Sequence, residues 1–427
     1  MTSEGYTEAF VWFWLPGETS PVVAGRLHAV DGELMFNYGR SYLTRVNAIP
    51  IYAPELPLES GTLPLLNGLK MPSCLRDASP DAWGRRVIIN RQLGAKRHDI
   101  DTDQLDEMTY LLESGSDRAG AIDFQRSATT YIPRTATSTL NELLGAVERV
   151  EQGVLLSDEL DQALLHGSSI GGARPKAMIE SNSRKFVAKF SSQQDVYSVV
   201  KGEYVAMRLA AEAGLNVAPV QIEHIAGKDI LLIERFDRQR DGQGWIRKAF
   251  VSALTLLELD EMMARYASYE NLGTIIRHRF TQPKATLREL FARLVFNILC
   301  GNTDDHARNH AAFWDGEALT LTPAYDVCPQ MRSGGEASQS MLIVGNESLS
   351  QISVCLKAAP NFLLSVKEAK EIIGHQVRVI RDRWPALCDE ADMNEVDRSL
   401  MWRRQFLNPF AFDGAPSDIA DLMPDEE

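Results

Sequence analysis

One stretch of the sequence, residues 176–236, constrains the fold more than any other, because its hydrophobic periodicity changes twice over a short distance. Apolar runs typical of strands flank a segment whose apolar residues recur at helical spacing, and this segment ends at Gly214, a residue favoured after a helix. The resulting order of strand, strand, helix, strand, strand is the order found in nucleotide-binding lobes. We predict strands at 176–179, 185–190, 217–223 and 229–236 and the helix at 202–213.

The chain is β-rich at its start and largely helical after this stretch. Near the N-terminus, apolar runs at 10–15, 22–27 and 33–38 alternate with turn signals such as Asp31-Gly32, which predicts a small β-meander or barrel. A further helix is expected to be capped by Ser138, with Glu142 nearby. Apolar residues at helical spacing predict helices at 82–93, 102–112, 138–151, 252–263, 287–300, 365–383 and 396–406.

These patterns place the chain in the α+β class and divide it into four parts. We expect an N-terminal subdomain over residues 1–130, a nucleotide-binding lobe over 131–245 and a mostly helical lobe over 246–410. The remainder, 411–427, holds six acidic residues and no basic residue. We therefore expect a solvated acidic tail, with docking on a basic partner as the alternative.

Composition excludes several classes of protein. The 44 Lys and Arg residues against 58 Asp and Glu residues give a formal charge of −14, so net charge does not favour nucleic-acid binding. A hydrophobic content of 44% supports packed cores rather than global disorder. The five cysteines form no C-x-x-C pair, and no stretch approaches the roughly 18 apolar residues that span a membrane. We expect a soluble cytoplasmic protein without a structural zinc site or a disulfide framework.

The densest group of polar residues lies at 301–310, directly after an apolar helix, and Asp326 follows it in the sequence Thr-Pro-Ala-Tyr-Asp. Protein-kinase chemistry needs an Asp that accepts the proton of the substrate hydroxyl, an Asn five positions later that binds a metal, and a later Asp that binds Mg²⁺. Asp304 and Asn309 have this spacing, and Asp326 supplies the second carboxylate. Oxygen ligands of this kind suit Mg²⁺, and His306 is expected to act as a positioning group.

Two other interpretations of this segment stay open at this stage. A loop rich in Asp and Asn can be purely structural, with side chains that cap backbone groups. His306 and His310 are four residues apart and could form a metal pair. No third ligand is evident nearby, however, and an asparagine-rich loop suits Mg²⁺ better than zinc.

A second group of residues, 168–176, is a loop of small residues that enters a predicted strand. Its glycines let backbone N–H groups approach phosphate oxygens, although the Walker A pattern is absent. Thirteen residues after Lys176, Lys189 stands among apolar strand residues, where burial requires an anionic partner such as a phosphate or Glu203. Lys189 could instead be a snorkelling edge-strand lysine, and Glu203 an ordinary first-turn helix residue.

A third group, Glu234, Arg235 and Phe236, comes where the last strand of the predicted nucleotide-binding lobe turns polar. A kinase binds adenine at this point through one backbone carbonyl and one backbone N–H. Because backbone groups carry the binding, the order of the three groups along the chain is more informative than the residue types here.

Together, these segments resemble the HipA-type serine/threonine kinase toxins of bacterial toxin–antitoxin modules. The resemblance rests on residues 169–176, 234–238, 301–309 and 322–326, and it extends over nearly the full chain. It implies a small N-terminal subdomain joined to a phosphatidylinositol-kinase-like bilobal kinase core, with ATP and Mg²⁺ as cofactors. The catalytic segment departs from the eukaryotic kinase pattern, because Asn302 and Thr303 stand where His and Arg would precede the Asp.

The resemblance also implies roles for single residues. Asp304 would be the catalytic base, Asn309 and Asp326 the Mg²⁺ ligands, and Lys189 the lysine that contacts phosphate. Ser169 falls at the position of an inhibitory autophosphorylation site, with the adjacent Ser168 as an alternative; a phosphate there would compete with the phosphates of ATP. The residues expected to contact ATP are Gly171, Gly172, Ala173, Arg174, Pro175, Lys176, Lys189, Glu234, Arg235, Phe236, His306, Asn309, Tyr325 and Asp326.

Partners follow from the same resemblance. It implies a HipB-like helix-turn-helix antitoxin, operator DNA bound through the antitoxin complex, and a protein substrate of the translation apparatus such as glutamyl-tRNA synthetase. Two alternatives remain: a small-molecule phosphotransferase of kinase-like fold, and a non-catalytic co-repressor that braces a DNA-binding antitoxin. The complete set of Lys189, Asp304, Asn309 and Asp326 argues against an inactive kinase.

Overall fold

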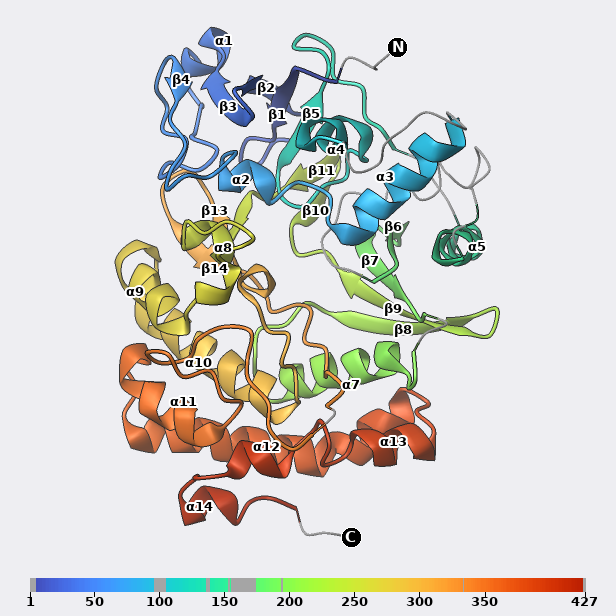
Figure 1. Cartoon of the computed structure of the whole chain (residues 1–427), viewed down its shortest axis with the longest axis vertical. Coiled ribbons are helices and arrows are strands. Elements are labelled where there is room, and N and C mark those ends of the chain that lie inside the picture. The colour runs from blue at the N-terminus through green and yellow to red at the C-terminus, as the bar shows by residue number, and fades with distance from the viewer. Residues whose placement is uncertain are drawn as a thin grey trace. The chain divides into compact units, whose positions relative to one another are not determined.

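The chain forms two compact units, each built from segments that are distant in sequence (Figure 1). The structure, a computed structural model, describes residues 5–95, 105–135, 139–152, 154, 174–192, 195–332 and 334–424. The expected division into four parts, with boundaries after residues 130, 245 and 410, stays a prediction. The first unit contains Met1–Ser192, His224–Val251 and Phe313–Glu317, and the second contains Gln193–Glu223, Ser252–Ala312 and Ala318–Glu427.

The first unit begins with the predicted β-meander. Its five-stranded antiparallel sheet has the order β4-β3-β2-β1-β5, and a bulge between Val11 and Trp12 shifts the pairing of β1 with β2. Because β4 and β5 are the edges, the described strands form an open sheet and not the barrel that the sequence left as an alternative. The strands are β1 (Glu8–Phe13), β2 (Val22–Val30), β3 (Glu33–Tyr38), β4 (Thr62–Leu63) and β5 (Ile122–Gln125).

Helices of the first unit follow the predicted periodicity, with one corrected cap. Thr139, not Ser138, caps α5: its side chain accepts from the Glu142 backbone N–H, and Glu142 accepts in return from the Thr139 backbone N–H. Ser138 lies outside the described residues, as does the predicted helical segment 102–104. The helices are α1 (Arg40–Leu43), α2 (Ser73–Arg76), α3 (Ala82–Ala95), α4 (Glu107–Glu113) and α5 (Leu140–Glu151).

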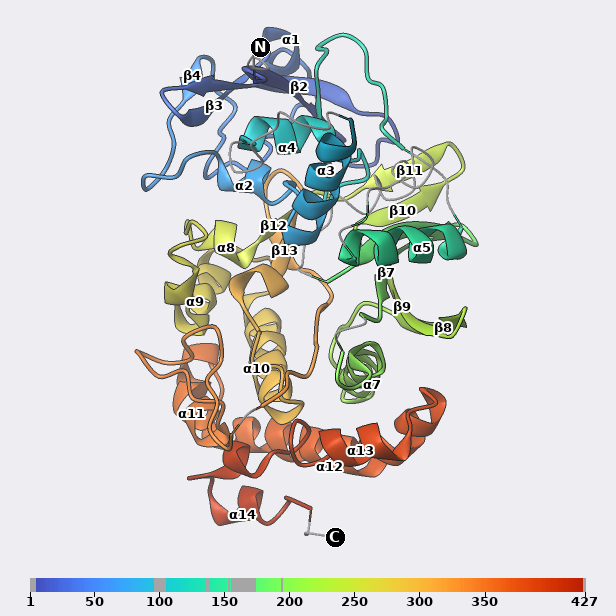
Figure 2. The ribbon, with the colours of Figure 1, turned by 45° about the vertical axis from the view of Figure 1, so that its right-hand side comes forward.

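A second sheet of the first unit carries the predicted strands of the nucleotide-binding lobe. The strands β6 (Lys176–Ser181) and β7 (Arg184–Phe190) form a hairpin, and Asn182 and Ser183 in its turn have φ of 49° and 60°, as a two-residue turn of this type requires. The strand β9 (Lys228–Glu234) pairs with β7. The helices α3 and α5 cover this sheet, and Figure 2 shows α5 beside β7. The core between them includes Trp83, Val147, Phe186, Phe190 and Leu232.

The remaining strands are short. A hairpin of β10 (Arg238–Asp241) and β11 (Gly244–Arg247) follows β9. The chain passes from one unit to the other within β8 (Val220–Ile225), β12 (Phe250–Ser252) and β13 (Ala311–Trp314).

The second unit is largely helical, as predicted. The helix α10 is its centre, since Leu287, Phe291 and Leu294 are fully buried, and α12 packs against both α7 and α10 (Figure 1). Among the described residues, no helix is both long and apolar enough to cross a membrane. The elements are α7 (Val199–Glu212), α8 (Ala253–Leu256), α9 (Tyr269–Arg279), α10 (Pro283–Leu299), α11 (Ile352–Ala358), α12 (Val366–Glu390), α13 (Glu395–Met401), α14 (Ser417–Ala420), the 3₁₀ turns η3 (Ala264–Tyr266), η4 (Ala307–Asn309), η5 (Ala359–Phe362) and η6 (Pro409–Phe412), and the strand β14 (Leu319–Leu321).

Two predicted helices end earlier than expected, each near a residue with left-handed backbone. The helix predicted at 252–263 ends at Leu256, because Glu258 has φ of 56°. The helix predicted at 396–406 ends at Met401, because Trp402 is extended and Arg403 has φ of 60°. Apolar spacing alone does not reveal such interruptions.

The acidic tail is not the solvated extension that its charge predicted. Ala411, Phe412 and Ile419 are buried, and α14 packs against α12. The Nζ atom of Lys370 on α12 lies 2.8 and 3.0 Å from the two carboxylate oxygens of Asp418. The few apolar side chains between the acids therefore decide the placement of this segment, at least up to residue 424, where the described chain ends.

Candidate active site

The predicted catalytic loop follows α10 in the second unit and starts at a glycine that no other residue could replace without strain. Gly301 has φ of 73°, and a Cβ atom there would lie 2.7 Å from the carbonyl oxygen of Gln405. Backbone bonds fix the loop on both sides: Asn302 N donates to Asn297 O at 2.8 Å, and Leu407 N donates to Leu299 O at 2.7 Å. The start of the loop is thus held against residues near the C-terminal end.

Asp304 and Asn309, which the sequence paired by spacing, are brought together by η4. The Nδ2 atom of Asn309 donates to the backbone carbonyl of Asp304 at 3.2 Å, and Asn309 is only 8% exposed. Asp304 itself is exposed. Because the amide nitrogen of Asn309 is used in this bond, its side-chain oxygen is the atom left for a cation.

Asp326 has a strained backbone and is tied to the same loop. Its φ of 59° is unusual for a residue other than glycine, and such conformations cluster at functional sites. Asn302 Nδ2 donates to the backbone carbonyl of Asp326 at 3.4 Å, and the Tyr325 hydroxyl donates to the carbonyl of Arg308 at 2.7 Å. These bonds connect the Asp326 segment to both ends of the catalytic loop.

The charges around Asp304 oppose one another. Partial burial raises the pKa of the Asp304 carboxyl, His306 lowers it, and the nearby carboxylates of Asp326 and Asp305 raise it again, for a net rise above the ordinary value. The Nδ1 atom of His306 is buried and has no hydrogen-bond partner among the described residues. A carboxyl whose pKa is raised in this way is a candidate for proton transfer.

The donor set fits Mg²⁺ better than zinc. No group of three or more His, Cys, Asp and Glu side chains suited to a metal is found in the part of the chain that the structure describes. Asn309 and Asp326 would supply two oxygen ligands, and Mg²⁺ commonly completes such a pair with phosphate oxygens and water. The predicted alternative of a His306 and His310 metal pair receives no support, since His310 is used elsewhere.

His310 belongs to a buried group that sequence reasoning missed. Its Nε2 atom lies 2.8 Å from Asp305 Oδ1 and 3.2 Å from the Tyr269 hydroxyl, which also donates to Asp305. All three residues are at most 3% exposed. Burial and then the neighbouring Asp305 carboxylate raise the pKa of Tyr269 well above its ordinary value. The adjacent acids at 304 and 305 were the available signal: one faces solvent, and the other anchors the loop.

Arg293 on α10 is a second residue that the sequence did not reveal. Its Nε atom donates to Glu289 at 2.8 Å, and Nη2 donates to Thr322 O at 2.9 Å and to Asn216 O at 3.1 Å. Arg293 therefore fixes the strand end that leads to Asp326. Arg293 and Asn309 both line a small cavity within this unit.

In the first unit, the two predicted phosphate-binding lysines lie directly opposite each other. Lys176 on β6 pairs in register with Lys189 on β7, so both side chains are on one face of the sheet, and they are 2% and 8% exposed. The Nζ atom of Lys176 lies 3.3 Å from Asp81 Oδ2, and Trp83 Nε1 donates to the Lys176 carbonyl at 3.0 Å. Buried ammonium groups need anionic partners, and Asp81 supplies one for Lys176.

Most of the predicted phosphate loop lies outside the described residues. This holds for Ser168, Ser169, Gly171, Gly172 and Ala173, whereas Arg174 is described. Pro175 is held at the strand end, since its carbonyl accepts from Phe190 N at 3.2 Å. Glu203 is buried on α7 of the second unit, and its pairing with Lys189 stays a prediction.

The predicted adenine-binding residues begin with Glu234, the last residue of β9, and their side chains are largely engaged within the first unit. Glu234 forms an ion pair with Arg184 at 3.2 Å. The guanidinium of Arg235 is buried and forms ion pairs with Asp117 and Asp237. The ring of Phe236 makes an edge contact with Phe313, with centroids 5.7 Å apart. Only backbone groups of this segment are therefore candidates for adenine.

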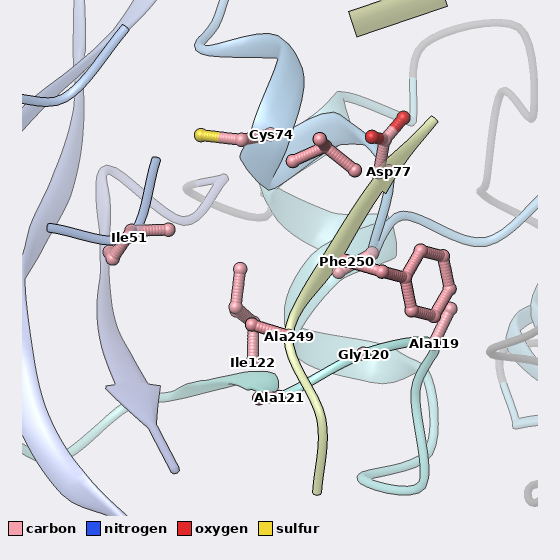
Figure 3. Close-up of a pocket in the computed structure, with 11 residues that line it drawn as sticks. Ile51, Cys74, Asp77, Ala119, Gly120, Ala121, Ile122, Ala249 and Phe250 are labelled. Atoms are coloured by element: carbon pink, nitrogen blue, oxygen red, sulfur yellow. The ribbon is translucent and has the colours of Figure 1, made fainter. Parts of the chain in front are cut away.

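A small pocket in the first unit contains none of the predicted site residues. Figure 3 shows Cys74 and Asp77 of the α2 segment on one side and the chain from Ala119 to Ile122 on another, with Phe250 beside it. Burial and then Glu55 raise the pKa of the Cys74 thiol well above its ordinary value, so this cysteine is not a reactive thiolate.

Two family models match the sequence. The model described as the HipA-like C-terminal domain matches residues 168–384, and the model described as the HipA N-terminal domain matches residues 19–125. The first match contains every residue expected to contact ATP or Mg²⁺.

Individual proteins are similar over much of the chain. The Sinorhizobium fredii protein Y4mE, which carries the name of a kinase, is 30% identical over 328 residues, covering 69% of this chain and 72% of that protein. The serine/threonine-protein kinase toxin HipA of Shewanella oneidensis is 25% identical over 241 residues, covering 50% of this chain and 54% of the toxin. A chain of the solved Shewanella oneidensis MR-1 complex of HipA, HipB and operator DNA matches with a TM-score of 0.68 and 19% identity, over 97% of this chain and 99% of that one. The two chains therefore share one fold.

Proposed function

Because the chain belongs to the HipA family, we propose that it is an ATP- and Mg²⁺-dependent serine/threonine protein kinase that acts as the toxin of a type II toxin–antitoxin module. One observation carries the proposal: Asp304 is exposed on a loop whose neighbours Asp305 and Asn309 are buried and hydrogen-bonded. A general base must reach the substrate hydroxyl from a position fixed in advance. The Asp304 loop has both properties.

In the proposed reaction, Asp304 accepts the proton of a serine or threonine hydroxyl while that oxygen attacks the γ-phosphorus of ATP. The bond from this phosphorus to the oxygen that it shares with the β-phosphate breaks, and ADP leaves. The raised pKa of the Asp304 carboxyl favours this proton transfer. Asn309 and Asp326 would hold Mg²⁺, which neutralises charge on the phosphates when bound. Tyr325 fixes the Asp326 segment through its bond to the Arg308 carbonyl. His306 offsets the negative charge around Asp304.

Residues of the first unit are proposed to bind ATP. Lys176 and Lys189 would bind phosphate oxygens, because they are cross-strand neighbours on one face of the sheet and an ammonium group pairs with phosphate. The loop 171–176, apart from Pro175, would add backbone N–H groups to the same phosphates. The backbone of Glu234, Arg235 and Phe236 would bind adenine, which leaves the buried Arg235 side chain to its ion pairs.

Regulation and partners form the finer part of the proposal. Phosphorylation of Ser169, or of Ser168 beside it, would place about −1.5 to −2 charge in the phosphate loop and switch the kinase off. We propose a HipB-like antitoxin as partner, operator DNA bound through that antitoxin, and a cytoplasmic protein of the translation apparatus as substrate. Glutamyl-tRNA synthetase is the first candidate to test.

The test is incubation with Mg²⁺ and γ-labelled ATP, with wild type compared with Asp304→Gln and with mass spectrometry of the 168–176 peptide. We expect label on Ser169 or Ser168 in wild type only. Label on both proteins would overturn the role of Asp304. If neither is labelled and the peptide carries no prior phosphate, self-silencing is wrong, and transfer to an external acceptor must then be measured.

External acceptors separate the remaining functions. A mixture of candidate proteins and small hydroxyl compounds, competing for labelled ATP, distinguishes a protein kinase from a small-molecule phosphotransferase. ATP binding without transfer to any acceptor would favour the non-catalytic co-repressor.

A further inference from the structure

The residues that follow β9 are the centre of a buried ionic cluster in the first unit. We use the name ionic cluster for Asp117, Lys185, Arg235, Asp237 and Arg238, whose side chains are at most 17% exposed. One of the five, Arg235, belongs to the segment assigned to adenine binding, and Asp237 and Arg238 follow that segment directly. The other two come from the loop between α4 and β5 and from β7.

Arg235 uses every N–H group of its side chain within this cluster. Its Nε and Nη2 atoms donate to the two carboxylate oxygens of Asp237 at 2.8 and 2.7 Å. Its Nη1 atom donates to the side chain and the carbonyl of Asp117 at 3.0 and 3.1 Å, and Nη2 also donates to the Arg118 carbonyl at 2.6 Å. These contacts account for all five N–H donors of a guanidinium.

Asp117 is the acid that all three cations of the cluster share. Its Oδ1 atom accepts from Arg235 at 3.0 Å and from Arg238 at 3.1 Å, and its Oδ2 atom accepts from Lys185 Nζ at 2.7 Å. Arg235 follows Asp117 by 118 residues, so the contact joins the N-terminal sheet region to the end of β9. A carboxylate with three cationic partners is hard to replace.

The backbone around Asp117 reinforces this connection. Gly120 N donates to Asp237 Oδ2 at 2.8 Å, and the Gly120 carbonyl accepts from Arg238 Nη1 at 2.9 Å. On the other side, Lys248 N donates to the Asp237 carbonyl at 3.0 Å. Figure 3 shows Gly120 on the chain that runs beside Ala249 and Phe250. The loop 117–120 is therefore hydrogen-bonded to residues 235–238 through both side chains and backbone.

We propose that Asp117 is a positioning residue of the ATP site, which holds the backbone of residues 234–236 in the conformation that binds adenine. The inference rests on the proposed kinase function, because that function assigns adenine to this backbone. Asp117 touches no substrate in this proposal. It acts through Arg235 and Arg238, whose side chains fix the chain on either side of Phe236.

The test compares Asp117→Asn with Asp123→Asn in the full chain. Asp123 is a matched control: it is equally buried, its carboxylate pairs with Arg118 and Arg134, and it makes no side-chain contact with the ionic cluster. Direct binding of a fluorescent mant-ATP gives the dissociation constant, steady-state kinetics give KM and kcat, and thermal unfolding checks that each variant is folded.

We expect Asp117→Asn to weaken ATP binding by about ten- to a hundredfold, as a misplaced binding group does, with kcat at saturating ATP changed far less. Asp123→Asn should lower stability without a comparable change in ATP affinity. Asp117→Glu, which keeps the charge, should recover part of the affinity and serves if the Asn variant does not fold. Equal ATP affinity in wild type and Asp117→Asn, or equal losses in the two Asn variants, would overturn the inference. Failure of wild type to bind ATP would instead overturn the proposed function.

Discussion

The ionic cluster of the first unit and the catalytic loop of the second are both dense in charged side chains, but they satisfy those charges in opposite ways. In the cluster, every N–H donor of Arg235 is used by groups of the same unit. In the loop, Asp305 is enclosed by His310 and Tyr269, whereas its neighbour Asp304 is exposed. The comparison teaches that density of charge does not identify a site. The exposed charge of Asp304 among enclosed neighbours is what makes this loop the candidate site.

The largest expected effect is a loss of phosphoryl transfer when the exposed Asp304 of the catalytic loop is replaced. Asp304→Gln should reduce phosphoryl transfer by about 10²- to 10⁴-fold, because it removes the proton acceptor. The free energy of unfolding should change by less than about 0.5 kcal/mol, since the side chain is exposed. Turnover and thermal unfolding measure the two effects, and Asp382→Gln on the exposed face of α12 is the control. Wild-type turnover in Asp304→Gln would remove this residue from the mechanism.

Replacing Asp117 of the ionic cluster should mainly change the free energy of unfolding. Asp117→Asn should lower the free energy of unfolding by about 3–5 kcal/mol at pH 7, because it leaves buried cations without their shared acid. Burial alone would raise the pKa of Asp117, but Arg235, Arg238 and Lys185 hold it well below the ordinary value. The stabilisation is therefore present above the unfolded pKa of about 3.9 and is lost as the pH falls through the folded pKa. Chemical unfolding at several pH values should show the gap between wild type and variant narrowing in acid; a constant gap would contradict this account.

Asp326, a proposed Mg²⁺ ligand, should show a smaller effect that depends on the Mg²⁺ concentration. Asp326→Asn should raise the Mg²⁺ concentration that gives half-maximal activity by about tenfold or more, because one carboxylate ligand is lost. Activity titrated with Mg²⁺ measures this shift. Asp315→Asn, in an exposed turn of the first unit, is the control. An unchanged titration in Asp326→Asn would argue against its role as a ligand.

The smallest expected effect is a loss of stability when Gly301, at the start of the catalytic loop, is replaced. Gly301→Ala should destabilise the protein by about 1–3 kcal/mol, because the added methyl group meets the Gln405 backbone in a left-handed conformation. Gly214→Ala is the matched control: its φ is also positive at 84°, but nothing lies within 4 Å of the new methyl group. Gly214→Ala should therefore show only the backbone part of the cost. Equal melting temperatures for the two variants would mean that the contact with Gln405 contributes nothing.

Much of the fold was predictable because periodicity records burial. Strands β6 and β7 and helix α10 lie where apolar spacing placed them, and the α+β class is confirmed. The spacing of apolar residues did not predict helix ends that depend on the backbone conformation of a single residue. Glu258 ends a predicted helix through its left-handed φ of 56°, and no side-chain pattern announces that. The prediction of a solvated tail was wrong for a related reason. The buried side chains of Phe412 and Ile419 pack this segment against the protein despite its acidic charge.

In the candidate site, only contacts between residues close together in the sequence could be predicted. Asp304 and Asn309 are five residues apart, and η4 brings them together as expected. Asp117 and Arg235 are 118 residues apart, so only the folded chain reveals that Arg235 is enclosed by a distant acid. Arg293 was missed for a similar reason: besides Glu289 on the same helix, its partners are the distant carbonyl groups of Asn216 and Thr322, which carry no side-chain signal.

The packing of Gln405 and Leu407 against the first residues of the catalytic loop has a genetic consequence. Every residue assigned to catalysis precedes position 327, yet the loop is held by a segment that the ribosome adds much later. A stop codon between these points would yield a chain that contains all the catalytic residues but lacks the brace on Gly301. If the kinase restrains growth, cells that escape it should therefore carry nonsense mutations far downstream of the active-site codons, up to the codon for Leu407.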